Sequence, residues 1–274
     1  MSDRVLVTVT DGVADVRFNR PDKRNALDGA QFAAIAEAGE HLKSEPGVRA
    51  VVLSGEGASF CAGLDFSIFG QMAGGVDVGG DEAGAQRDGN PGRLTESGLT
   101  HLGQQVRWVW QELPVPGIAA MRGHALGGGL QIALGADIRI AHPDTQLSVR
   151  ELHWGITPDM TGTFVLSKLV RPDVARELTY TARVFGAREG HTLGLVTRLS
   201  DTPYEAAMEL AAEIAGRNPQ GVRGAKALFN RMFAAGVADQ FEQERIVVRS
   251  LIGTPNQVEA ITANLESRPA SFAD

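Results

Sequence analysis

Two segments rich in small residues could each present backbone N–H groups to a ligand oxygen. Residues 123–131 read Gly-His-Ala-Leu-Gly-Gly-Gly-Leu-Gln, between an apolar run at 118–121 and a helix-like stretch at 130–134. This order predicts a strand, a tight glycine turn and the start of a helix. The unpaired N–H groups and positive dipole end of a helix start favour an oxygen with negative charge. A turn that serves packing alone is the alternative.

A second donor is expected in residues 59–66, which read Ser-Phe-Cys-Ala-Gly-Leu-Asp-Phe and follow a predicted buried strand at 50–53. Because Ala62 and Gly63 are small, a ligand can approach the backbone, and the N–H of Leu64 can face it. Two backbone N–H groups that meet on one carbonyl oxygen form an oxyanion hole, which stabilises an enolate or a tetrahedral oxyanion. Together the two segments predict such a hole.

These segments and their spacing resemble the crotonase superfamily, also called the enoyl-CoA hydratase/isomerase family. Five collinear segments carry the resemblance: 16–27, 60–65, 123–137, 151–163 and 253–272. The resemblance implies that the backbone N–H groups of Leu64 and Gly128 bind the thioester carbonyl of an acyl-CoA.

The same resemblance implies an α/β fold, a crotonase-like spiral of ββα units followed by helices. Residues 1–200 would form the core with the CoA and acyl site. Residues 201–274 would form a helical region that covers the active site and makes trimer contacts. The expected assembly is a homotrimer, or a hexamer made of two trimers.

The carboxylates decide which reaction the resemblance implies. Hydratases of this family hold and activate water with two glutamates; here the first position is Gln131 and the second matches Glu151. An amide orients a partner but accepts no proton near neutral pH, so the two-glutamate set is incomplete. Asp159 stands where most hydratases carry a small residue. Dienoyl-CoA isomerases of the family carry Asp there, paired with the Glu, and a further Asp where Gln131 stands.

The site pattern is therefore closest to the dienoyl-CoA isomerase branch, with Glu151 and Asp159 as catalytic residues. The implied reaction moves a double bond, as in 3,5-dienoyl-CoA to 2,4-dienoyl-CoA, by carboxylate proton transfer through a thioester enolate. Gln131 is expected to position the substrate or to hydrogen-bond Glu151. Two alternatives stay open: a hydratase that adds water to a trans-2-enoyl-CoA, and a CoA-binding protein without turnover. Asp159 could also merely cap the helix that follows it.

The resemblance also places the CoA moiety. Four residues are expected to contact or border its adenine and phosphate: Lys23, Arg24, Ala62 and Asp65. Pro269 stands where several relatives carry a phosphate-binding lysine, so Arg268 and Lys226 are candidates for that contact. CoA is part of the substrate, and no separate cofactor is expected.

The composition fits a globular enzyme with an acidic surface. The chain has 274 residues, 43% of them hydrophobic and 22% charged, which is enough to bury a full core. A net charge of −7 argues against a nucleic-acid partner. The single cysteine, Cys61, excludes an internal disulfide, suits a reducing cytoplasm and is expected to be a buried packing residue.

Targeting and metal motifs are not apparent in the sequence. The absence of a signal peptide or membrane-length apolar run predicts a cytoplasmic protein with no membrane partner. The six histidines show no metal-ligand spacing, so no metal is predicted.

Periodicity outlines the elements that must position these residues. Strands at 5–9 and 13–18 flank Asp11-Gly12, a hairpin signal, and a helix follows with Asp28 as N-cap. The glycine-rich segment 70–98 is expected to be a lid or a disordered loop. Four helices are predicted near the end of the chain: 204–217, 222–235, 239–251 and 257–266.

Overall fold

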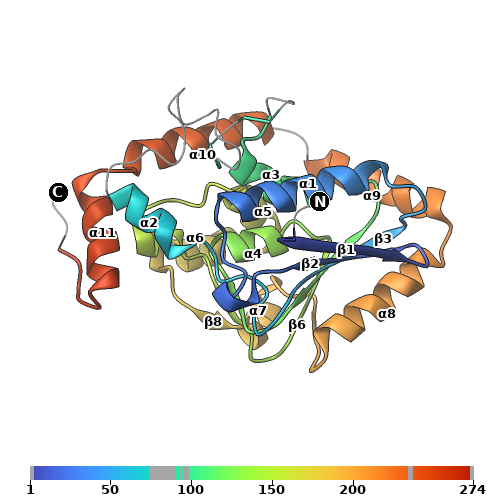
Figure 1. The fold of residues 1–274 in the computed structure, drawn as a ribbon. Coiled ribbons are helices and arrows are strands. Elements are labelled where there is room, and N and C mark those ends of the chain that lie inside the picture. Colours follow the sequence, from blue (N-terminus) through green and yellow to red (C-terminus); the bar gives the residue numbers. More distant parts are fainter. Residues whose placement is uncertain (1–2, 74–90, 93, 96–98, 234–236, 272–274) are drawn as a thin grey trace.

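The computed structural model describes residues 3–73, 91–92, 94–95, 99–233 and 237–271, which form two sheets and the helices around them (Figure 1). Most of the predicted lid or loop at 70–98 lies outside the described residues. Its first residues, 70–73, complete a helix.

The main sheet has the strand order β1-β2-β3-β4-β6-β9. Its strands are β1 (Val5–Thr10), β2 (Val13–Phe18), β3 (Ala50–Gly55), β4 (Gly117–Met121), β6 (Ile138–Ala141) and β9 (Arg198–Leu199). β1 and β2 pair antiparallel across Asp11-Gly12, whose φ values of 51° and 83° confirm the predicted hairpin turn. The other pairs of this sheet are parallel.

The structure has a second, smaller sheet, and one of its strands was not part of the strand–turn–helix prediction for residues 118–134. This sheet consists of β5 (His124–Leu126), β7 (Gln146–Ser148) and β8 (Phe185–Gly186). β5 lies between β4 and the glycine turn, so a second strand precedes α4 (Gly128–Ala133). Its three residues are extended because they pair with β7, and a strand this short carries no sequence periodicity.

Helices surround the two sheets. Those before residue 200 are α1 (Gly29–Ser44), α2 (Phe66–Ala73), α3 (Leu102–Glu112), α4, α5 (Gly162–Leu169), α6 (Pro172–Thr181) and α7 (Ala187–Leu193), with 3₁₀ turns η1 (Pro21–Lys23) and η2 (Glu151–Trp154). The four later helices, α8 (Pro203–Ala215), α9 (Pro219–Phe233), α10 (Val237–Leu251) and α11 (Pro255–Leu265), confirm the four predicted. Asp28 caps α1 as predicted, since its Oδ1 accepts the N–H of Gln31 at 2.9 Å.

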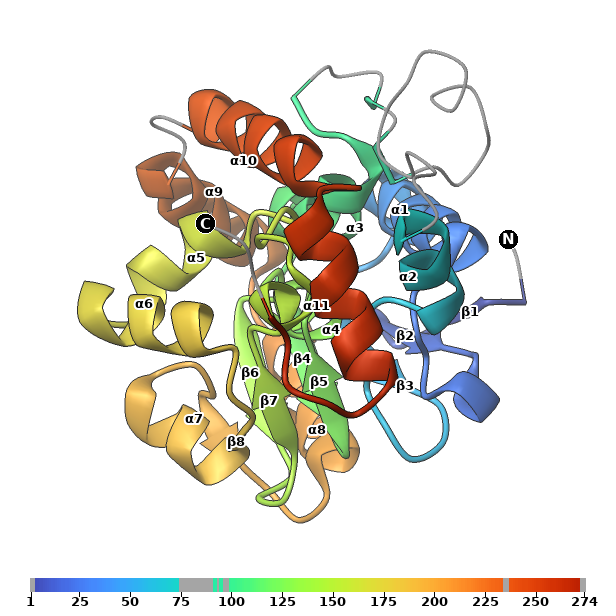
Figure 2. The same ribbon diagram turned by 90° about the vertical axis from the view of Figure 1, so that its left-hand side faces the viewer.

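The two faces of the main sheet are covered by different helices. On one face, α8 places Ala207, Ala211 and Ala215, four residues apart, against a cluster that includes Val52 and Ile118. The larger core cluster lies on the other face and includes residues of α1 and α3. Beyond it, α11 packs beside α2 near the end of α10 (Figure 2). In the described part of the chain, no helix combines the length and apolarity needed to cross a bilayer.

Candidate active site

A cavity of about 550 Å³ lies among η1, α2, the start of α4, η2 and α10. Every predicted site residue except Gln131 lines it: Lys23, Arg24, Ala62, Leu64, Asp65, Gly128, Glu151 and Asp159. Sequence reasoning missed the apolar walls, which are supplied by Phe69, Met72, Trp154, Val248 and Ile252. The predicted residues thus converge from four separate parts of the chain.

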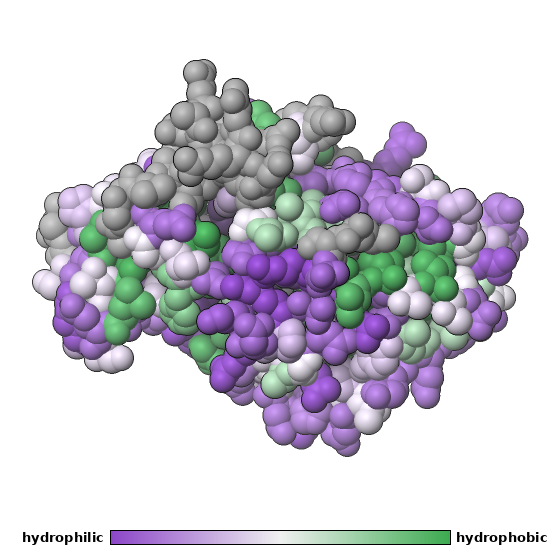
Figure 3. Space-filling model, viewed as in Figure 1, coloured by the Kyte–Doolittle hydropathy of each residue, from purple (hydrophilic) through white to green (hydrophobic). Residues whose placement is uncertain are grey.

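The rim of the cavity is partly apolar. Hydrophobic side chains reach the surface where α2 and α11 lie (Figure 3). Phe66 of α2 is 64% exposed and lines the cavity. Its ring contacts Trp154, and Trp154 stacks on Phe69 with 4.2 Å between ring centroids. Aromatic rings therefore form one wall, which suits an apolar part of a ligand.

The two predicted donor segments run side by side. Cys61 donates its N–H to the carbonyl of His124 at 2.9 Å, and Leu126 donates back to Cys61 at 3.1 Å. A Cβ on Gly63 would lie 2.7 Å from the oxygen of Leu126 and 3.9 Å from the nitrogen of Gly128. The absence of that Cβ lets the backbone around Leu64 approach the start of α4.

Two amides at this meeting point have no acceptor in the part of the chain that the structure describes. The N–H of Asp65 is donated to Leu27 and that of Gly127 to Ser148, both at 2.9 Å. Among the described residues, none accepts a hydrogen bond from the N–H of Leu64 or Gly128. Because both residues line the cavity, both amides are available to a ligand oxygen.

Glu151 is a buried carboxyl at the start of η2, only 5% exposed. Its Oε1 accepts a hydrogen bond from Gln131 Nε2 at 2.5 Å, and its Oε2 has no hydrogen-bond partner in the described structure. Burial raises its pKa to about 7. Such a group can take up or release a proton near neutral pH.

Asp159 lies in the loop between η2 and α5 and faces the cavity. Burial, together with the negative charges of Glu151 and Glu244, raises its pKa to about 8. The alternative that Asp159 only caps the next helix is wrong. That helix, α5, begins at Gly162, its N-cap residue is Thr161, and no side chain makes a capping hydrogen bond there. Asp159 is therefore a carboxyl held in the cavity wall without a capping role.

Gln131 links the Glu151 carboxyl to the turn after Asp159, without lining the cavity. Of the two partners expected for it, the structure has Glu151. Its Oε1 accepts the N–H groups of Met160 at 3.1 Å and Gly162 at 2.8 Å, in the turn after Asp159. A glutamate here would lose the donor to Glu151 and add a second charge, which explains the amide physically.

The raised pKa of Asp159 predicts a pH-dependent gain in stability for Asp159→Asn. The folded chain binds this proton more tightly than the unfolded chain, so folding becomes less favourable as pH rises from about 4 to about 8. We expect the variant to gain on the order of 1–3 kcal/mol over wild type at pH 9 and nothing at pH 4. Urea unfolding at both pH values measures it; an equal effect at both contradicts the prediction.

The residues expected at the CoA moiety form the other end of the lining. Lys23 and Arg24 belong to η1 and its C-cap, where Arg24 has a φ of 50°. Asp65 pairs with Arg20 at 2.6 Å and accepts the N–H of Ser67 at 2.9 Å. Asp65 therefore borders the cavity as a fixed side chain, with its charge already compensated.

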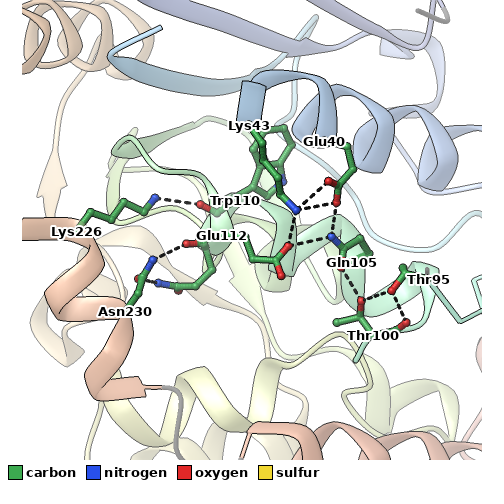
Figure 4. Close-up of polar contacts among 10 residues, drawn as sticks. Glu40, Lys43, Thr95, Thr100, Gln105, Trp110, Glu112, Lys226 and Asn230 are labelled. Carbon is green, nitrogen blue, oxygen red and sulfur yellow. Dashed lines mark hydrogen bonds and ion pairs between the residues drawn. The ribbon is translucent and has the colours of Figure 1, made fainter. Parts of the chain in front are cut away.

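Neither candidate for the missing phosphate-binding lysine lines the cavity. Lys226 is 5% exposed, and its Nζ donates to the carbonyl of Trp110 at 3.1 Å (Figure 4). The same Nζ donates to the carbonyl of Val115 at 2.8 Å and pairs with Asp137 at 2.9 Å. Arg268 forms ion pairs with two glutamates, Glu259 of α11 and Glu266 directly after that helix. The prediction for Lys226 is wrong, because the ammonium group ties α9 to α3 inside the protein.

Lys226→Met is therefore expected to act on stability and not on substrate binding. Two backbone carbonyls and Asp137 lose a buried donor, which costs about 1–3 kcal/mol of unfolding free energy. Chemical denaturation and the KM for an acyl-CoA measure the two effects. A KM raised tenfold or more with unchanged stability would contradict this prediction and show that Lys226 takes part in substrate binding.

Cys61 is fully buried, which confirms the packing role predicted for it. Burial raises its thiol pKa to about 12, so the reactive thiolate is not populated near neutral pH.

Known proteins match this chain over nearly its whole length. The family model "Enoyl-CoA hydratase/isomerase" matches residues 8–274. A probable enoyl-CoA hydratase, EchA14 of Mycobacterium tuberculosis, is 34% identical over 251 residues, covering 92% of this chain and 90% of the relative. The crotonyl-CoA hydratase of Syntrophomonas wolfei is 30% identical over 98% of each chain.

Solved structures share the fold. An enoyl-CoA hydratase/isomerase from Mycobacterium paratuberculosis superposes with a TM-score of 0.83 at 21% identity, over 96% of this chain and 98% of that one. One from Pseudoalteromonas atlantica gives 0.82 at 26% identity, over 98% and 100%. These matches confirm the predicted crotonase-like fold. Because the family model matches residues 8–274, this chain belongs to the enoyl-CoA hydratase/isomerase family.

Proposed function

We propose that the protein is an acyl-CoA isomerase that moves a double bond in an enoyl- or dienoyl-CoA, of the 3,5-dienoyl to 2,4-dienoyl type. The supporting observation is the pair of cavity-lining carboxyls, Glu151 and Asp159, whose pKa values are raised to about 7 and about 8, close to neutral pH. Gln131 occupies the position where a hydratase of the family would use a second glutamate, and its amide is engaged in hydrogen bonds to Glu151 and to the backbone of the turn after Asp159.

The proposed reaction begins with the thioester oxygen on the N–H groups of Leu64 and Gly128. Negative charge that develops on this oxygen is stabilised there, so the adjacent carbon becomes more acidic. The group with the lower pKa, Glu151, is the more ionised and removes a proton from C2. The electron pair spreads through the enolate and the diene, and protonated Asp159 supplies a proton at C6. The double bonds shift, and no water or separate cofactor takes part.

Hydration of a trans-2-enoyl-CoA is the second candidate, because relatives such as the crotonyl-CoA hydratase bear that name. In that case Glu151 and Asp159 would hold the water between them. A CoA-binding protein without turnover is the third candidate. It requires both carboxyls to be dispensable.

A panel of two substrates separates these candidates. With a 3,5-dienoyl-CoA, we expect a growing absorbance from the conjugated 2,4-diene and slower or no loss of the 2-enoyl absorbance with crotonyl-CoA. Hydration of crotonyl-CoA without diene conversion would establish the hydratase instead. Tight binding of both thioesters without any turnover would support the third candidate.

We further propose the homotrimer, or a hexamer of two trimers, expected from the family. Exposed apolar side chains on α9 and α10 support an assembly: Leu228, Phe229, Ile246 and Val247. Light scattering on the purified protein measures the mass, and a monomer would exclude both assemblies.

A further inference from the structure

Glu244 reaches from α10 to the turn that follows Asp159. Its Oε2 accepts the N–H of Thr161 at 2.9 Å, and its Oε1 accepts the hydroxyl of Thr163 at 2.5 Å. Glu244 is 5% exposed and does not line the cavity. It therefore acts on the site through the turn and does not contact a substrate.

The turn needs support from outside because its backbone is strained. Thr161 is β-branched and has a φ of 65°, in the left-handed region that such residues avoid. Gln131 of α4 accepts the amides on either side of Thr161, and Glu244 accepts the amide of Thr161 itself. Two side chains from distant elements thus hold three consecutive N–H groups directly after Asp159.

Glu244 is itself fixed by α3. Gln104 Nε2 donates to the carbonyl of Phe241 at 2.9 Å and lies 3.4 Å from Glu244 Oε2. Gln104 Oε1 in turn accepts a hydrogen bond from Arg245 at 2.9 Å. The groups around the carboxylate are donors, so its ionised form is satisfied without a proton.

We propose that Glu244 is a positioning residue, which acts through residues 159–163 to fix where the Asp159 carboxyl stands in the cavity. The inference rests on the catalytic role proposed for Asp159.

The charge of Glu244 has a second effect on the site. Burial raises the pKa values of Asp159 and Glu151, and the negative charge of Glu244 raises both further. The other charged groups that act on Glu244 are Arg107 of α3 and Arg245 of α10. Burial also raises the pKa of Glu244 itself, against the hydrogen bonds from Thr163 and Thr161, which favour its ionised form. In that form Glu244 adds to the burial that favours a protonated Asp159, the form that the proposed proton donor needs.

Glu244→Gln tests the proposal, because the variant keeps the volume and removes the charge. We expect kcat at neutral pH to fall about tenfold with KM within about twofold. The pKa of Asp159, read by ¹³C-carboxyl NMR and assigned with Asp159→Asn, should fall by about half a unit or more. Glu242→Gln is the matched control: this exposed residue lies on the same helix and should keep wild-type kcat.

Glu244→Asp separates position from charge and serves if the glutamine variant does not fold. It keeps the charge on a shorter side chain, so kcat should fall several-fold while the pKa of Asp159 stays near the wild-type value. Wild-type kcat in either variant, or an unchanged Asp159 pKa in Glu244→Gln, overturns the proposal.

The NMR titration reads Asp159 whichever acyl-CoA reacts. If crotonyl-CoA hydration is the activity found, kcat is measured on that reaction. The same changes in kcat and in the pKa of Asp159 then support or overturn the proposal. Full activity in Asp159→Asn would instead remove the proposed function on which it rests.

Discussion

Asp159→Asn is expected to lower kcat for double-bond migration by roughly 10³-fold, with a much smaller change in KM. The amide keeps the shape of the side chain but can neither donate nor accept the proton that must move. Glu151→Gln should have an effect of similar size, because the reaction needs one ionised and one protonated carboxyl. Steady-state kinetics on a 3,5-dienoyl-CoA measures both variants.

The wild-type pH profile provides an independent check on the same pair. Because the carboxyl pKa values are about 7 and about 8, kcat/KM should be bell-shaped, rising as Glu151 ionises and falling as Asp159 ionises. Asp173→Asn is a suitable control, since Asp173 is an exposed carboxyl of α6 paired with Arg171. Turnover that survives in Asp159→Asn would show that a single carboxyl performs the reaction.

Gly63→Ala is expected to lower kcat/KM by about 10²–10³-fold, the cost of losing a donor from an oxyanion hole. Gly63 has a φ of +90°, and the added Cβ would lie 2.7 Å from the carbonyl oxygen of Leu126. Since that neighbour is backbone, the two donor segments must move apart, and Leu64 and Gly128 can no longer face one oxygen.

Gly47→Ala is the matched control for Gly63→Ala. Its φ of +82° imposes similar backbone strain, yet nothing lies within 4 Å of the added Cβ. This variant should lose about 1–2 kcal/mol of stability, measured by denaturation, and keep wild-type kcat/KM. Equal kinetic losses in the two alanine variants would show that strain alone, and not the separation of the segments, accounts for the effect of Gly63→Ala.

Local sequence signals predicted much of the fold. The hairpin turn at Asp11-Gly12 and the cap at Asp28 each satisfy a requirement within a few residues, so they can be recognised in the sequence. The helices after residue 200 carry full periodicity and lie close to their predicted limits. β5 was missed because pairing with β7, twenty residues away, makes it a strand.

The convergence of the candidate site residues on one cavity was predictable where collinear motifs carry them. Leu64, Gly128, Glu151 and Asp159 line one cavity, as their positions in the motifs imply. Glu244 was not predictable, because nothing in the sequence of α10 indicates that this residue contacts a turn more than eighty residues earlier.

The prediction for Lys226 failed for a related reason. A lysine is usually on the surface, and only the packing of α9 on α3 buries this one. The apolar walls from α2 and α10 were missed as well, since helix periodicity shows an apolar face but not what that face covers.

The structure of a complex with acetoacetyl-CoA tests the central claim most directly. The account predicts the thioester oxygen at about 2.7–3.1 Å from the backbone nitrogens of both Leu64 and Gly128, with C2 beside the two carboxyls. A thioester seated in the cavity with its oxygen away from both amides would contradict it.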